Sequence, residues 1–246
     1  MIHREWYTGE ESLPQPATTE YILGLDLGQS RDFSAWVLVE RTKYDDQLAK
    51  YHVRHIDRIR DQSYPAIVRH TATLVTALMA TLRASQGDRR IAPQRPPRVS
   101  LIVDYTGVGR PVADLLTDAD LGVEMQLVTI TGADQTTQGE SGDWRVPKRV
   151  LASTVQVGLQ TTRLTIEPTL TLAKTLTAEL QNFKVKIALN GHDSYGAAEE
   201  WREGNNDDLV LSLALALWWG DARPGSWDDL TAADIAAWAR LGAARR

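Results

Sequence analysis

Acidic residues lie where apolar segments begin or end, and acids in such places can bind metal ions. Asp26 and Asp104 each close a short apolar run, and Asp207 and Asp208 precede a long apolar stretch, residues 209–219. Carboxylates that a fold brings together repel one another unless a cation joins them. The sequence therefore suggests a divalent-metal site built from acids that are far apart in the chain.

Each of these acids also has an ordinary structural explanation. Asp26 or Asp104 could cap the turn that follows a strand. An acid at the position of Asp207 or Asp208 is more often a helix N-cap than a metal ligand. Two consecutive acids exceed what one cap requires, so one could cap the helix while the other faces the site. Spacing alone does not decide between the two.

Composition limits the class of protein. The 246 residues suit one large domain or two small ones, and the absence of cysteine excludes disulfides and thiolate metal sites. A net charge of −5 argues against a broad, sequence-indifferent nucleic-acid binder. No stretch could span a bilayer, and the first twenty residues lack the apolar core of a signal peptide. We therefore expect a cytosolic protein with no membrane partner.

Hydrophobic periodicity predicts an α/β fold that positions these acids. The expected strands are residues 21–27, 33–41, 50–60, 98–105 and 123–130, with a short extended piece at 164–166. The expected helices are residues 65–84, a helix opening near 111, a helix from 147, and residues 169–182 and 206–219. The first three strands are close enough to form an antiparallel meander. The later alternation of strands and helices predicts a mixed sheet flanked by helices.

The connecting and terminal segments have a different composition. Residues 131–142 are expected to form a flexible polar loop. Residues 1–20 are expected to be a linker or arm, 21–222 the main domain, and 223–246 a tail with one more helix near 232–241.

The order of the acids on a strand, a second strand and a closing helix is the order found in ribonuclease-H-like (RNase H-like) nucleases. Within that superfamily the chain resembles the C-terminal nuclease domain of the large terminase subunit of tailed bacteriophages. The likeness rests on four stretches, residues 24–35, 103–109, 146–164 and 206–216. The likeness as a whole runs from about Tyr21 to Trp219. One departure is Asn206, where a histidine would be expected before the acid pair.

This resemblance implies a fold, a reaction and a set of ligands. The implied fold is an RNase H-like mixed sheet, with an antiparallel meander and parallel strands. Asp26, Asp104 and one of Asp207 and Asp208 would bind two Mg²⁺ or Mn²⁺ ions, with Asp208 slightly preferred. Asp32 could be an outer acid, although a turn residue that bonds its own backbone is the preferred interpretation. The implied activity is that of a hydrolase, an endonuclease that cuts double-stranded viral DNA during genome packaging in the host cytoplasm.

The resemblance also implies partners. Full-length members of the family carry an ATPase motor before the nuclease domain, and they work with a small terminase subunit and a portal. The P-loop motif of such motors does not occur in this sequence. We therefore expect an excised nuclease domain or the product of a split gene.

Two pairs of basic residues are candidates for binding DNA. Lys184 and Lys186 alternate with apolar residues before an Asn-Gly turn, so both would point to one face of a strand. Lys148 and Arg149 open a helix, whose N-terminus favours anions. Edge lysines that prevent aggregation, or ordinary surface charge, would explain the same residues. No feature indicates base-edge readout, so recognition by shape and charge is expected.

Three other functions compete with this interpretation. A Holliday-junction resolvase or transposase-like nuclease would share the superfamily. A non-catalytic docking module of the packaging motor would share the fold without cleavage. Residues 26–30 also resemble the first phosphate loop of actin/Hsp70-like ATPases, but that fold needs two duplicated lobes and no second loop of this kind occurs.

Overall fold

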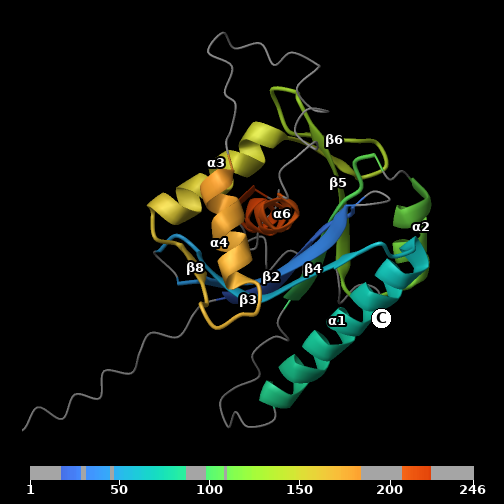
Figure 1. Ribbon diagram of the computed structural model, residues 1–246, viewed down its shortest axis with the longest axis horizontal. Coiled ribbons are helices and arrows are strands. Elements are labelled where there is room, and N and C mark those ends of the chain that lie inside the picture. Colours follow the sequence, from blue (N-terminus) through green and yellow to red (C-terminus); the bar gives the residue numbers. More distant parts are fainter. Residues whose placement is uncertain are drawn as a thin grey trace, which may run out of the picture.

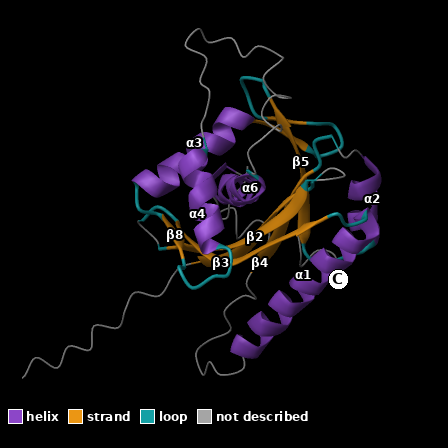
Figure 2. Cartoon of the chain, viewed as in Figure 1, coloured by secondary structure: helices purple, strands orange, loops and turns teal. Residues whose placement is uncertain are grey.

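The structure is a computed structural model that describes residues 18–28, 32–44, 47–86, 98–107, 110–183 and 207–222. Within these ranges an eight-stranded sheet lies between two layers of helices (Figure 1). Helices α3, α4 and α6 cover one face of the sheet, and α1 and α2 cover the other (Figure 2).

The strands have the order β6-β7-β5-β4-β1-β2-β3-β8 in the sheet. Their bounds are β1 Thr18–Asp26, β2 Phe33–Lys43, β3 Lys50–Arg60, β4 Arg98–Asp104, β5 Glu124–Thr131, β6 Thr137–Gln138, β7 Trp144–Pro147 and β8 Leu164–Ile166. The helices are α1 Tyr64–Gln86, α2 Arg110–Asp118, α3 Lys148–Gln160, α4 Ala173–Asn182 and α6 Asp208–Ala222.

The pairing of the strands confirms the expected mixed sheet. Strands β1, β2 and β3 form the antiparallel meander. Strands β4, β5 and β7 then add in parallel on the other side of β1, and β8 pairs in parallel with β3. Because β1, β3, β4, β5 and β7 all run in one direction, their C-terminal ends share one edge of the sheet. We call this the C-terminal edge.

Helix α6 is apolar all round because protein surrounds it. It packs against the sheet on one side and against α3 and α4 on the other (Figure 1). The helix crosses β1 very closely at Gly24, where a Cβ atom would lie 1.9 Å from the carbonyl oxygen of Ser212. Any side chain at position 24 would therefore push α6 away from the sheet.

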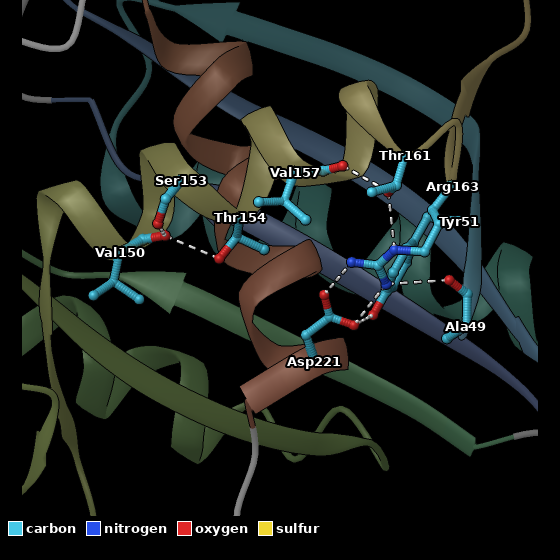
Figure 3. A network of polar contacts seen from close by, with 9 residues as sticks. All are labelled: Ala49, Tyr51, Val150, Ser153, Thr154, Val157, Thr161, Arg163 and Asp221. Carbon is cyan, nitrogen blue, oxygen red and sulfur yellow. Dashed lines mark hydrogen bonds and ion pairs between the residues drawn. The ribbon is translucent and has the colours of Figure 1, made fainter. Parts of the chain in front are cut away.

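The C-terminal end of α6 is held by a separate polar cluster (Figure 3). Tyr51 on β3 donates its hydroxyl to Asp221 at 2.5 Å, and Arg163 binds the same carboxylate at 3.0 and 3.2 Å. Burial and the neighbouring Asp221 carboxylate raise the pKa of Tyr51 well above its usual range, so the hydroxyl remains a donor. The axial position of α6 is thus fixed at the end opposite Asp208.

Several boundaries differ from the sequence predictions. Strand β1 begins at Thr18, so residues 18–20, expected in the arm, belong to the sheet. The expected loop at 131–142 contains β6, and β7 follows it, although neither strand was predicted. Helix α4 begins at Ala173 rather than at Thr169. Residues 1–17, the predicted 190–191 turn, and the tail 223–246 with its predicted helix lie outside the described residues. None of the described helices is both long and apolar enough to cross a membrane.

Candidate metal centre

Asp26 and Asp104 are side by side at the C-terminal edge. They are in-register partners on the neighbouring parallel strands β1 and β4, and neighbouring strands lie about 4.8 Å apart. Alternation along the strands puts Asp26 on the face of Ile22 and Asp104 on the face of Ile102, and both isoleucines pack in the core beneath α6. The two acids therefore point to the same face of the sheet, and they are only 8% and 3% exposed.

Helix α6 brings the third acid to this face. The Ser212 hydroxyl accepts a hydrogen bond from the Asp26 backbone N–H at 3.2 Å, and it lies 2.8 Å from the carbonyl oxygen of Ala35. Ser212 is one helical turn after Asp208, whose carbonyl oxygen is 2.9 Å from the same hydroxyl. The first turn of α6 is therefore attached to β1 at Asp26 itself, with Asp208 as the first residue of the helix.

The neighbourhood of Asp208 is strongly negative. Burial, followed by the charges of Asp207 and Asp32, raises the pKa of Asp208 to about 6, and Arg58 opposes this shift. The backbone of Asp207 also contributes to the helix, because its carbonyl oxygen accepts a hydrogen bond from the Leu211 N–H at 2.9 Å. Asp32, which was expected to be a turn residue, is thus close enough to influence the acid on α6.

Glu179 on α4 is a member of this cluster that was not predicted. Its carboxylate accepts the Leu209 N–H at 3.2 Å, capping the start of α6, and pairs with Arg58 at 3.2 Å. Burial and the charge of Asp208 raise the pKa of Glu179 to about 7, against the effects of Arg58 and Leu209. A signal existed in the sequence, because Glu179 lies three residues after Leu176 on an apolar stripe, where a buried acid needs a partner.

Thr106 is a second residue that was not predicted. Its backbone N–H donates to Asp104 Oδ1 at 2.8 Å, and its hydroxyl makes a short hydrogen bond to the same oxygen. The Thr106 hydroxyl in turn accepts the Ile130 N–H from β5 at 2.7 Å. One oxygen of Asp104 is therefore held in place by two donors and, through them, by the neighbouring strand.

The strand register also places a basic residue at the level of the acids. Asp104, Asp26, Ala35 and Arg58 are successive in-register partners on β4, β1, β2 and β3. We call these four residues the acid row. Arg58 lies at the β3 end of the row, where its guanidinium group also stacks 4.3 Å from the centre of the Phe33 ring.

Comparison with known proteins identifies the fold. No protein-family model and no curated protein sequence matches the chain. Among solved structures, the manganese-soaked nuclease domain of human cytomegalovirus terminase matches with a TM-score of 0.51 at 10% identity, over 83% of this chain and 85% of that one. The chain has a terminase-nuclease-like fold. This likeness confirms the expected RNase H-like class, and at such low identity it concerns the fold alone.

Two other solved structures match with TM-scores below 0.5. The large terminase nuclease of the thermophilic phage G20c has 20% identity over 83% of both chains, with a TM-score of 0.45. Thermus thermophilus RuvC has 11% identity over 80% of this chain and 90% of its own, with a TM-score of 0.34.

The donor chemistry of the acidic centre suits a hard divalent cation. As the side chains stand in the described ranges, no three His, Cys, Asp or Glu groups are arranged to hold a metal ion. The groups that gather here are nevertheless carboxylates, which Mg²⁺ and Mn²⁺ prefer. The crowding that raises the pKa of Asp208 is also what a bound cation would relieve. The residues therefore fit such an ion in chemical type.

Of the basic candidates, one pair lies at the same edge of the sheet. Lys148 and Arg149 open α3 directly after Pro147, the last residue of β7. Arg149 is exposed and pairs with Asp134 at 2.7 Å, in the segment between β5 and β6. Lys184 and Lys186 lie outside the described residues.

Proposed function

We propose that this chain is a metal-dependent endonuclease that cuts double-stranded viral DNA during genome packaging. The observation that carries the proposal is the in-register pair of Asp26 and Asp104, which faces the N-terminus of α6. Acids on two strands and at the start of a helix would supply carboxylate ligands for the two ions of a phosphodiester hydrolase. The terminase-nuclease-like fold supports the same assignment.

In this proposal Asp26, Asp104 and Asp208 hold two Mg²⁺ or Mn²⁺ ions, and Asp207 is the alternative ligand on the helix. When bound, such ions supply an activated water and stabilise the charge on the leaving oxygen. The protein's own work is to fix the carboxylates in advance. Thr106 fixes an oxygen of Asp104, and Glu179 fixes the start of the helix that carries Asp208.

The proposed substrate and partners follow from the same assignment. The substrate is double-stranded DNA, and the partners are the ATPase motor, the small terminase subunit and the portal, in the cytoplasm of an infected bacterium. With a net charge of −5, contacts to DNA must be local, so binding outside the packaging complex should be weak and sensitive to salt.

Cleavage of a linear duplex by the purified chain tests this function. With Mg²⁺ or Mn²⁺ we expect cutting, and Asp26→Asn or Asp104→Asn should reduce its rate by about 100-fold or more, because each removes a charged ligand. Asp118→Asn, at an exposed acid at the end of α2, is the matched control and should leave the rate unchanged.

Two results would count against the proposal. Cleavage that persists in both variants in the presence of EDTA would reject the mechanism. Cutting of four-way junctions in clear preference to linear duplex would favour a resolvase instead.

A further inference from the structure

A second arginine lies just beyond the acid row at the C-terminal edge. Arg60, the last residue of β3, is the in-register partner of Phe33, the first residue of β2. Two residues back along the same strands, beyond the pair of Ser34 with Ile59, Ala35 pairs with Arg58, which belongs to the acid row. Arg60 therefore lies two residues further toward the C-terminal edge than the level of the acids, on a strand two positions from that of Asp26.

Phe33 and both arginines point to the same face of the sheet as the acids. Ala35 and Ile56 pack in the core beneath α6, and side chains two residues apart on a strand share a face. Phe33 therefore lies on the face of Ala35, while Arg58 and Arg60 lie on the face of Ile56. Cation–π contacts of both guanidinium groups with the Phe33 ring agree with this placement.

The two arginines differ in burial and in their neighbours. Arg58 is mostly buried, stacks 4.3 Å from the centre of the Phe33 ring and pairs with Glu179. Arg60 is exposed, and its guanidinium carbon lies 5.2 Å from the centre of the same ring. An aromatic ring restricts the freedom of an arginine, and a guanidinium group suits the geometry of phosphate oxygens. Arg58 thus lies in the interior of the site, while Arg60 lies at its exposed margin.

We propose that Arg60, oriented by the Phe33 ring, contacts a backbone phosphate of double-stranded DNA on the β3 side of the acid row. This inference rests on the proposed function and adds a residue that contacts the substrate. Two strand spacings of about 4.8 Å separate β1 from β3, which makes about 10 Å. At that separation Arg60 contacts a phosphate near the scissile one and not the scissile phosphate itself.

The opposite flank of the acid row also carries positive charge. Lys148 and Arg149 follow β7, which is two strands beyond β4 in the other direction. Along the C-terminal edge the acids therefore lie between two basic flanks. A duplex lying along this edge would present phosphates to both flanks while one phosphodiester faces Asp26 and Asp104.

The salt dependence of DNA binding tests the role of Arg60. The probe is a fluorescein-labelled 20-base-pair duplex, titrated by anisotropy in EDTA so that no cleavage occurs. Arg60→Ala should weaken binding several-fold. It should also reduce the magnitude of the negative slope of log K against log salt by about 1, which corresponds to the loss of one phosphate contact. Arg60→Lys should keep the slope, because it retains the charge, with a weaker affinity.

Arg54→Ala is the matched control. Arg54 is an exposed arginine on the same strand, six residues before Arg60 and away from the C-terminal edge. Its side chain pairs with Glu40 at 3.0 Å. It should leave both the affinity and the slope unchanged. If Arg60→Ala fails to fold, as judged by circular dichroism, Arg60→Gln replaces it, with the same expected loss of slope.

The outcomes separate this proposal from the proposed function. A slope that is unchanged in Arg60→Ala or Arg60→Gln, or that Arg54→Ala lowers equally, overturns the contact. A wild-type chain that does not bind the duplex overturns it as well. If the wild-type chain binds DNA but never cuts it with Mg²⁺ or Mn²⁺, the proposed endonuclease activity is rejected. In that case a salt dependence that is reduced in Arg60→Ala but not in Arg54→Ala still supports the contact of Arg60 with DNA. If the wild-type chain cuts DNA and Arg60→Ala leaves the salt dependence unchanged, only the proposed contact of Arg60 is rejected.

Discussion

Thr106 gives the Asp104 carboxylate its fixed orientation. Its backbone N–H and its hydroxyl both donate to Oδ1, and the hydroxyl accepts the Ile130 N–H from β5. Partners that orient a metal ligand typically contribute about 10- to 100-fold in metal affinity. At the scale of single residues, the quality of the site thus depends on a threonine that is no ligand itself.

Replacing this hydroxyl gives the first prediction. Thr106→Val keeps the shape of the side chain but leaves the Ile130 N–H without its acceptor, so we expect Mn²⁺ affinity to fall about 10-fold and stability by about 1–2 kcal/mol. Thr106→Ser should restore both, as measured by calorimetric titration and thermal melting. Thr73→Val, at an exposed helical threonine, is the control. A valine variant with wild-type Mn²⁺ affinity would show that the hydroxyl has no orienting role.

The residues that could be predicted from sequence are those with a local signal. Asp26 and Asp104 interrupt apolar runs, and the interruption is visible in the chain itself. Thr106 and Arg58 give no comparable signal, and Glu179 gives only its place on an apolar stripe. Their partners are distant: Ile130 is 24 residues from Thr106, and Arg58 is 121 residues from Glu179. Only the tertiary fold makes such pairs recognisable.

At the scale of elements, α6 is the part that completes the site. Four contacts set its position: the close crossing at Gly24, the Ser212 bridge, the Glu179 cap and the Asp221 cluster at its far end. Two of these lie at the acid end of the helix. A helix held at both ends fixes the backbone of Asp208 relative to the strands that carry Asp26 and Asp104, and a fixed backbone is part of the preorganisation that catalysis favours.

The Glu179 cap gives the second prediction. Glu179→Ala removes the acceptor of the Leu209 N–H and the partner of Arg58, so Leu209 should exchange its amide hydrogen faster and stability should fall by about 1–3 kcal/mol. Glu179→Gln retains an acceptor and should protect Leu209 better than alanine does. Glu167→Ala, at an exposed acid outside the cluster, is the control. Unchanged protection of Leu209 in the alanine variant would remove Glu179 from any positioning role.

Most elements could be predicted because their periodicity is long and regular. The bounds of β3 match the prediction, and α1 extends it by one residue before and two after. Strands β6 and β7 were missed because two and four residues are too few to show alternation. The early start of β1 was missed because Thr18–Glu20 are polar, and their place in the sheet depends on pairing with β2.

At the scale of the whole molecule, the acidic centre links stability to pH. Burial and neighbouring charge raise the pKa of Glu179 from 4.5 to about 7 and that of Asp208 from 3.8 to about 6. The folded protein therefore binds these protons more tightly than the unfolded chain does. The resulting stabilisation is complete below about pH 4 and is lost as the pH rises through 6 and 7.

The third prediction follows from this linkage. Without metal, the free energy of unfolding should be lower at pH 8 than at pH 5 by about 1–2 kcal/mol, because a pKa change of one is worth about 1.4 kcal/mol and solvent screens part of it. The melting temperature should be lower at pH 8 accordingly. Glu179→Gln should reduce the difference. Mn²⁺ should raise the melting temperature more at pH 8 than at pH 5, since a cation binds the ionised carboxylates. A metal-free protein that is as stable at pH 8 as at pH 5 would contradict the coupling of these acids.

The architecture as a whole could be predicted because the order of strands and helices restricts the topology. The meander and the alternating segments indicated the mixed sheet, and the sheet brought Asp26 and Asp104 into register. The relative height of α6 on the sheet could not be predicted, because it depends on the contact between Gly24 and Ser212, residues 188 positions apart.

The most direct test is anomalous diffraction from crystals soaked in MnCl₂, measured near the manganese absorption edge. We expect manganese peaks between the carboxylates of Asp26 and Asp104 at the N-terminus of α6, and the loss of at least one peak in Asp104→Asn. Crystals that bind manganese only elsewhere, or that show no peak at this edge of the sheet, would contradict the metal centre and the endonuclease that depends on it.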